Sequence, residues 1–333
     1  MAGRTLFPRL VKQGVRTTER LKRKRMHGII IIDEKAENRQ TKDRIWKTGG
    51  YITMDYRLGL YEKAMPSGLS WQEMMEAGRE AGFDQLEISI DETDARLARL
   101  EWSPEQRLAL LRDGAAAGFP VRTMCLSGHR KYPLGSRDEA TRRRGMEIME
   151  KAIQFACDTG VRLIQLAGYD VYYEEGGDDT RAMFADNLAK SVEIAARYGV
   201  ILGFETMETP FMDTISKGMA YVSDIGSPYL GMYPDLGNLT NACYLYGLDV
   251  GEEIRSGYGH TYAMHLKETV EGVYRDMDFG TGRVDFVPGI REAWNGGIRL
   301  FTAEFWHDGG SDWRGRLKRT NDFIRARFAE ALR

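Results

Sequence analysis

One unit recurs along most of this chain: a short apolar run, a polar loop, and an amphipathic stretch that often ends in glycine. Runs of this length, separated by helical patterns, predict strands of a parallel sheet, because parallel neighbours need a crossover that is usually a helix. Eight such runs are present, at residues 57–63, 83–90, 120–127, 162–168, 200–206, 230–235, 262–267 and 298–305.

The stretches between the runs carry helix start and stop signals. Ser70 and Glu73 match a capping box, and Ser103 with Pro104 offers an N-cap followed by a first-turn proline. Residues 139–159 and 181–198 place apolar side chains at helical spacing. Glycine precedes five runs, where a left-handed residue can end a helix: Gly82, Gly118, Gly160, Gly199 and Gly297.

Eight strands alternating with helices predict a (β/α)₈ TIM barrel, whose typical size is about 250 residues. A doubly wound open sheet is the alternative, but it usually has fewer strands and would spread their ends along one edge. The barrel instead gathers the carboxyl ends of all strands around one mouth, where active sites of this fold lie.

Four consecutive runs, the fifth to the eighth, each place a potential metal ligand near their end: Glu205, Asp235, His265 and Glu304. Burying a carboxylate is costly unless its charge is compensated, so three carboxylates and one imidazole at one mouth indicate a shared divalent cation. Small Gly203 and Ala263 on the ligand-bearing faces are expected to leave room below the ion. The oxygen-rich set suits Mn²⁺, Mg²⁺ or Co²⁺, and Zn²⁺ remains open.

Charge and cysteine content limit the class of protein. The 333 residues have a formal net charge of −2, but residues 1–50 hold 14 Lys/Arg against 5 Asp/Glu, so the remainder carries −11. An acidic body argues against nucleic acid as its ligand. No apolar run approaches the roughly 20 residues of a membrane helix. Three widely spaced cysteines without a CxxC pair favour a reducing compartment, and we expect a cytoplasmic protein.

The basic start is expected to be a separate extension, residues 1–53, ahead of a barrel domain at 54–333. It lacks a sustained apolar period, which favours disorder, although a nucleic-acid or membrane arm is an alternative. Met54 opens the first credible strand, so a further hypothesis makes it the natural start of the protein.

Several stretches across residues 54–333 resemble the L-ribulose-5-phosphate 3-epimerases, which are sugar-phosphate members of the xylose-isomerase-like barrels. They are Leu58-Gly-Leu-Tyr-Glu-Lys-Ala64, Glu87-Ile-Ser-Ile-Asp-Glu-Thr-Asp94, Met124-Cys-Leu-Ser-Gly-His-Arg130, Ala167-Gly-Tyr-Asp-Val-Tyr-Tyr173, Tyr233-Pro-Asp-Leu-Gly-Asn238 and Val284-Asp-Phe286. The resemblance implies a metal-dependent interconversion of L-xylulose 5-phosphate and L-ribulose 5-phosphate, in pentose or L-ascorbate catabolism. It also implies the same four metal ligands and a homo-oligomer, with a dimer favoured.

Epimerisation at C3 of a 2-ketose removes a proton beside a carbonyl and returns one to the opposite face. Two carboxylates are needed, and Glu205 and Glu304 are the two glutamates expected at the metal. We therefore expect them to exchange acid and base roles, with Asp235 and His265 acting as ligands only.

Binding of a sugar phosphate needs further groups. His129, Arg130, Lys267 and Arg275 are candidates for the phosphate. Glu87 and Asn238 are candidates for the sugar hydroxyls, with Glu62 as an equal alternative.

Five other functions compete with this one. A 3-epimerase of free ketohexoses would use the same chemistry without the phosphate contacts. An aldose–ketose isomerase or an inosose dehydratase could use the same barrel, and an abasic-site endonuclease would carry more than the five histidines present. A sugar-phosphate sensor without activity is the non-enzymatic alternative.

Overall fold

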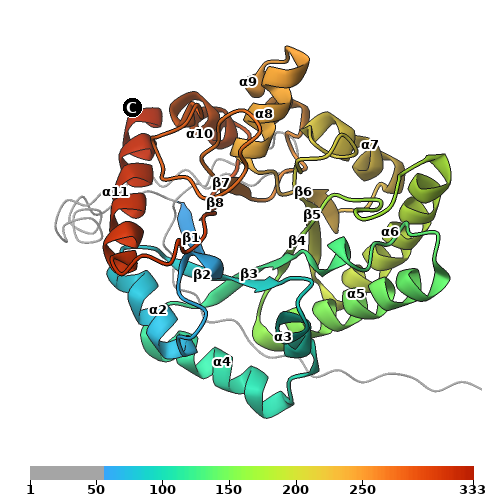
Figure 1. The fold of residues 1–333 in the computed structure, drawn as a ribbon, viewed down its shortest axis with the longest axis horizontal. Helices are drawn as coiled ribbons and strands as arrows, with labels where there is room; N and C mark the ends of the chain where they lie inside the picture. The colour runs from blue at the N-terminus through green and yellow to red at the C-terminus, as the bar shows by residue number, and fades with distance from the viewer. Residues whose placement is uncertain (1–55) are drawn as a thin grey trace, which may run out of the picture. The chain divides into compact units, whose positions relative to one another are not determined.

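The computed structural model describes residues 56–333, and they form a parallel eight-stranded barrel (Figure 1). Neighbouring strands pair in the order β6-β5-β4-β3-β2-β1-β8-β7. The strands are β1 (Arg57–Tyr61), β2 (Gln85–Ile90), β3 (Val121–Leu126), β4 (Leu163–Leu166), β5 (Ile201–Phe204), β6 (Leu230–Met232), β7 (Met264–Leu266) and β8 (Leu300–Ala303).

Two isolated parallel bridges connect β6 to β7, the ends of that order. They join Met232 to Thr261 and Asp235 to His265, and the His265 amide donates to the Pro234 carbonyl at 2.8 Å. The strands therefore surround a common axis, which confirms the predicted barrel and excludes the open doubly wound sheet.

Helices cover the outside of the barrel (Figure 1). The longer ones are α2 (Trp71–Glu80), α4 (Pro104–Ala117), α5 (Glu139–Thr159), α6 (Asp178–Tyr198), α7 (Ile215–Ile225), α8 (Leu236–Tyr246), α10 (Phe286–Asn295) and α11 (Trp313–Ala331), with shorter α3 (Asp94–Leu97) and α9 (Val250–Ser256). Ser70 forms the predicted capping box, and Ser103 is the predicted N-cap, where the structure also shows a capping box with Gln106. All five glycines expected before strands have positive φ.

Tyr233 fills the barrel interior beneath the mouth. It is fully buried and packs against Leu163 and Ala263. A Cβ on Gly203 would lie only 2.9 Å from the Tyr233 Cβ. The prediction that Gly203 and Ala263 leave space below an ion is therefore wrong, because the tyrosine ring takes that space.

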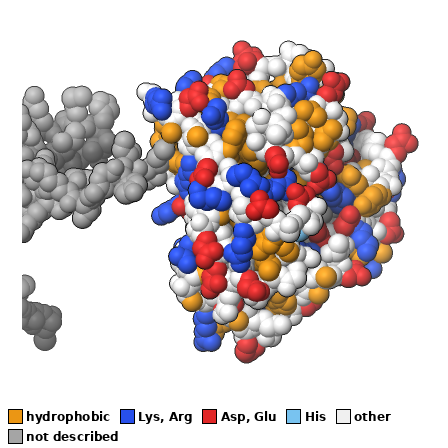
Figure 2. Space-filling view, turned by 60° about the vertical axis from the view of Figure 1, so that its left-hand side comes forward, with side chains coloured by type: hydrophobic (Ala, Val, Ile, Leu, Met, Phe, Trp, Pro, Cys, Tyr) orange, Lys and Arg blue, Asp and Glu red, His pale blue; other side chains and the backbone are white. Residues whose placement is uncertain are grey.

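The expected extension over residues 1–53 and the hypothetical start at Met54 lie outside the described residues. Within residues 56–333, no helix is long and apolar enough to cross a membrane. On the face drawn in Figure 2, acidic and basic side chains of the described residues are interspersed. A broad basic area of the kind that binds nucleic acid is not seen on that face.

Candidate metal centre and active site

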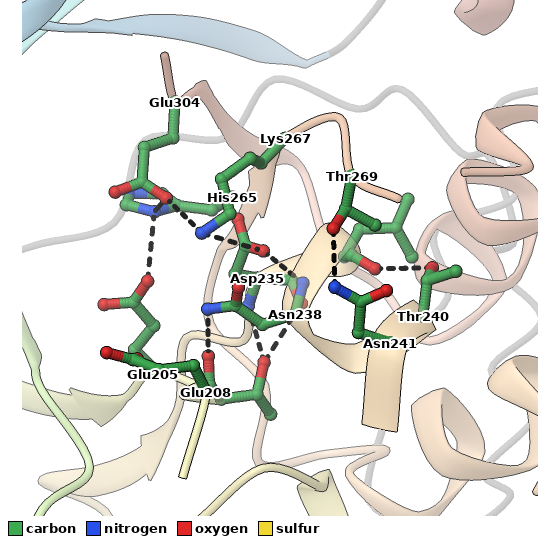
Figure 3. A network of polar contacts seen from close by, with 12 residues as sticks. Glu205, Glu208, Asp235, Asn238, Thr240, Asn241, His265, Lys267, Thr269 and Glu304 are labelled. Atoms are coloured by element: carbon green, nitrogen blue, oxygen red, sulfur yellow. Dashed lines mark hydrogen bonds and ion pairs between the residues drawn. The ribbon is translucent and has the colours of Figure 1, made fainter. Parts of the chain in front are cut away.

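The structure brings the four predicted metal ligands together at the mouth of the barrel (Figure 3). Glu205 follows β5, Asp235 follows β6, His265 lies in β7 and Glu304 follows β8. One donor atom from each lies within 4.8 Å of the others, and all four residues are buried.

Continuation of the parallel ladder sets this arrangement. The Glu205 amide donates to the Leu166 carbonyl, and the Glu304 amide donates to the Leu266 carbonyl, both at 2.9 Å. Each ligand is thus held level with the neighbouring strand by main-chain hydrogen bonds. Asp235 is also the N-cap of α8, where its Oδ1 accepts from the Asn238 amide at 2.6 Å.

His265 directs its two ring nitrogens to different partners. Its Nε2 lies 2.5 Å from Glu87 Oε1, on the inner side. Its Nδ1 lies 3.3 Å from Glu304 Oε2 and 3.9 Å from Glu205 Oε1. The Nδ1 therefore belongs to the group of potential ligand atoms.

The two glutamates differ in their electrostatic surroundings. Burial raises the pKa of Glu205 well above its usual value, and Glu304 raises it further. Burial acts the same way on Glu304, but Lys267 and His265 outweigh it and hold that pKa well below its usual range. The pair therefore favours one protonated and one ionised carboxyl group.

The other two ligands are also perturbed. Burial raises the pKa of Asp235 to about 6, against the opposing charge of Lys267. Burial lowers the pKa of His265, but Glu87 and Glu304 overcome this and raise it well above its usual value. Lys267 Nζ lies 3.0 Å from Glu304 Oε2 and 3.3 Å from Asp235 Oδ1, so it links two of the carboxylates.

The donor set fits a divalent cation. Asp235 Oδ2 is buried and has no hydrogen-bond partner among the described residues, although such an oxygen is costly to leave unpaired. A cation among the three carboxylates would satisfy this oxygen and offset their charge. Carboxylate oxygens with one imidazole nitrogen suit Mn²⁺, Co²⁺, Zn²⁺ or Mg²⁺.

A cavity of about 220 Å³ opens above the cluster. Its floor includes Glu205, Glu304 and Lys267, and its walls include Tyr61, Cys125 and Trp306. Charged side chains of both signs lie at its rim: the cationic residues Lys63, Arg130 and Arg275, and the acidic residues Asp91, Glu92 and Glu208.

Four of the six predicted substrate-binding residues line this cavity: Arg130, Asn238, Lys267 and Arg275. Asn238 donates its amide hydrogen to the Thr206 carbonyl at 2.7 Å and leaves Oδ1 buried without a partner among the described residues. The Nε of Arg130 is likewise buried without a partner there. Both atoms belong to residues that line the cavity.

Two predicted contacts do not fit the structure. His129 is buried away from the cavity, where its Nε2 lies 3.1 Å from the Gly145 carbonyl oxygen. Burial lowers its pKa to about 4, so it is a neutral residue and a poor partner for phosphate. Glu87 is fully buried behind His265 and cannot reach a sugar hydroxyl.

Glu62, the alternative to Glu87, is also occupied elsewhere. It forms ion pairs with Arg96 and with Arg99, the latter at 2.7 Å, and it accepts from the Ser89 amide. Its charge is therefore compensated within the fold rather than by a metal or a sugar.

Sequence reasoning missed the residues that hold Arg130. Its Nη2 donates to the Tyr169 hydroxyl at 3.2 Å, and this hydroxyl donates to Glu208 at 2.6 Å. The guanidinium also lies over the Tyr172 ring, 4.8 Å from its centroid. The nearest signal in the sequence is the aromatic group at residues 169–173.

Comparison with known proteins agrees with this architecture. The family described as xylose isomerase-like TIM barrel matches residues 75–327. A structure titled "Structure of L-ribulose 3-epimerase" superposes with a TM-score of 0.68 at 22% identity, covering 83% of this chain and 95% of the other. The D-psicose 3-epimerase of Clostridium cellulolyticum H10 gives 0.68 at 17% identity, covering 81% and 98%. At these identities the likeness concerns the fold.

Curated relatives give a closer assignment. Proteins named L-ribulose-5-phosphate 3-epimerase UlaE from Salmonella paratyphi B and Salmonella schwarzengrund are each 46% identical over 275 residues. The match covers 82% of this chain and 95% of each relative. The predicted resemblance and the enzyme class are thereby confirmed. The chain is an isomerase-class enzyme that belongs to the L-ribulose-5-phosphate 3-epimerase family within the xylose isomerase-like TIM barrels.

Proposed function

We propose that this protein is a metal-dependent epimerase that interconverts L-xylulose 5-phosphate and L-ribulose 5-phosphate by inversion at C3. The relatives that share 46% identity are named for L-ribulose 5-phosphate. The single structural observation that carries the proposal is the buried cluster of Glu205, Asp235, His265 and Glu304 beneath an open cavity.

The proposed chemistry divides between the cluster and a cation held by it. A divalent cation bound by the four residues would supply the charge that polarises the ketose carbonyl and stabilises a developing enediolate. Glu205 and Glu304 both line the cavity, so either carboxylate can reach a substrate. One removes the C3 proton, and the other donates a proton to the opposite face.

Without a bound cation the two glutamates already differ, because the pKa of Glu205 is raised and the pKa of Glu304 is lowered. A two-base epimerase needs one ionised and one protonated group at the start of each turnover. Glu205 and Glu304 would hold these two states in turn, and their acid and base roles exchange with the direction of the reaction. Asp235 and His265, which do not line the cavity, act as ligands only.

We propose that the cationic residues of the rim bind the phosphate. Arg130 has a buried, unpaired Nε and is held by Tyr169 and Tyr172. Arg275 lines the same cavity and lies over Trp306, with its Cζ 5.2 Å from the ring centroid. The free Asn238 Oδ1 can accept from a sugar hydroxyl, and Lys267 is placed to contact an oxygen near the reacting carbon.

Three broader features are also proposals. The family resemblance supports a place in pentose or L-ascorbate catabolism. The free cysteines Cys125, Cys157 and Cys243 support a reducing compartment such as the cytoplasm. A homodimer is proposed as the assembly.

The direct test measures conversion of L-xylulose 5-phosphate beside free D-tagatose and D-psicose, with chelated and metal-reloaded protein. The proposal expects turnover of the phosphorylated ketose, loss of activity on chelation and recovery with Mn²⁺, Co²⁺, Zn²⁺ or Mg²⁺. Turnover of the free ketohexoses alone would move the function to an unphosphorylated substrate. No turnover of any ketose by metal-loaded protein would favour a sensor.

A further inference from the structure

A second carboxylate layer lies beneath the metal ligands, on the side away from the cavity. Its central residue is Glu87 of β2, which is fully buried inside the barrel. Glu87 Oε1 meets His265 Nε2 at 2.5 Å, and Glu87 Oε2 accepts from the Tyr233 hydroxyl at 2.7 Å. The carboxylate thus has one partner on each oxygen.

These contacts decide which nitrogen of His265 carries a proton. Carboxylate oxygens accept hydrogen bonds, so we place the proton between Glu87 and His265 on Nε2. On the other side of the ring, Gln165 Nε2 lies 3.1 Å from His265 Nδ1 and 3.3 Å from the Tyr233 carbonyl oxygen. Because a carbonyl oxygen only accepts, this Gln165 atom is the amide donor, and Nδ1 is left as an acceptor.

The ring is therefore held in one orientation by residues from three strands. Glu87 comes from β2, Gln165 from β4, and Tyr233 from the segment after β6. Tyr233 is fixed in turn by Thr302 of β8, whose Oγ1 lies 2.8 Å from the tyrosine hydroxyl. None of these side chains lines the cavity, so substrate binding does not explain their arrangement.

We propose that Glu87 is a positioning residue of the metal centre: it holds the proton of His265 on Nε2 and aims Nδ1 at the cation. Tyr233 supports this geometry by donating to Glu87 Oε2. The Gln165 contact identifies Nδ1 as the acceptor, and a cation at Nδ1 would replace that hydrogen bond, because the nitrogen has one lone pair. The inference rests on the metal centre that forms part of the proposed function. It replaces the predicted role of Glu87 in sugar binding with a role in metal affinity.

The variant Glu87→Gln tests the role with little change in volume. Loss of an outer partner of a metal-bound histidine typically weakens metal affinity by 10–100-fold. We expect a Kd for Zn²⁺ that is about 10–100-fold higher than in the wild type, measured by competition with a chelator. Glu253→Gln is the matched control, because Glu253 is buried but binds Ser216, away from the ligands. Its Kd should stay within about twofold of wild type.

A second readout does not depend on any variant at residue 87. In ¹⁵N-histidine NMR of the wild-type enzyme loaded with Zn²⁺, the inference expects His265 coordinated through Nδ1 with a proton on Nε2. The chain has five histidines, and His265→Asn assigns the signal. Coordination through Nε2, or an Nε2 without a proton, would overturn the inference even if Glu87→Gln fails to fold.

The possible outcomes distinguish failure of the positioning role from failure of the proposed function. If the wild type binds no divalent metal, the metal centre and the proposed function both fail. If the wild type binds Zn²⁺ and Glu87→Gln binds it within twofold of the same affinity, only the positioning role is overturned.

Discussion

The floor and the rim of the cavity hold their side chains by different means. On the floor, Glu205 and Glu304 follow strand ends whose main-chain hydrogen bonds continue the barrel ladder. At the rim, Arg130 lies in a short 3₁₀ turn and depends on side chains from other loops, such as Tyr169 and Glu208. The floor therefore suits chemistry that needs fixed geometry, and the rim suits selection among substrates.

This division gives a first prediction for the floor. Replacing Glu304 or Glu205 by Gln should lower kcat by about 10³-fold, because each change removes a proton-transfer group. Steady-state rates with L-xylulose 5-phosphate measure the loss. Glu253→Gln, which alters a buried glutamate on α9, should retain activity within about twofold. A residual rate near wild type in Glu205→Gln would remove Glu205 from catalysis.

Glu62 is a strand-end glutamate that stabilises the fold, in contrast to the glutamates that are proposed to bind metal. Because Arg96 and Arg99 would be left without their partner, Glu62→Gln should lower the free energy of unfolding by about 3 kcal/mol. Urea unfolding of metal-free protein measures this change. The affinity for metal should stay within about twofold, and a larger loss would blur the distinction between the two groups of glutamates.

Substitutions at the rim should change the selection of substrates. Arg130→Met should raise KM for L-xylulose 5-phosphate by about 10–100-fold with a smaller change in kcat, since charge-assisted hydrogen bonds contribute about 1.5–3 kcal/mol. The adjacent Lys131→Met is the control, because Lys131 is exposed and pairs with Asp94. Equal losses with free L-xylulose would show that Arg130 does not recognise phosphate.

The last prediction concerns His129 and stability at acid pH. Its pKa of about 4 in the folded protein lies below the value of about 6.5 expected after unfolding, so the unfolded chain takes up the proton first. Stability from this group is complete above pH 6.5 and declines towards pH 4, by up to about 3 kcal/mol. Urea unfolding at several pH values should show a weaker acid loss in His129→Gln. An unchanged slope would show that the buried His129 does not contribute to the loss of stability at acid pH.

The floor could be predicted from the sequence because its signals are local and repeated. Each ligand closes an apolar run, and parallel register brings successive strand ends to one level. The depth of a residue within a strand is harder to predict. Glu87 shares an inward-facing position with the ligands, but β2 continues to Ile90, which leaves Glu87 below the mouth.

The other contacts of the site could not be predicted, because their partners are distant in sequence. Glu62 pairs with Arg96 and Arg99, which lie in the segment after β2. Arg130 approaches Glu208 where the loops after β3 and β5 lie together. The Tyr233 side chain fills the interior of the barrel, and the small residues Gly203 and Ala263 alone do not reveal this in the sequence. Such contacts are set by tertiary packing and not by the period of a single strand.

The most direct test of the central claim is proton NMR in D₂O with metal-loaded enzyme and L-xylulose 5-phosphate. We expect L-ribulose 5-phosphate to appear with deuterium at C3, because Glu205 and Glu304 exchange protons with solvent between turnovers. L-ribulose 5-phosphate formed without deuterium at C3 would contradict proton transfer through two carboxylates that line an open cavity.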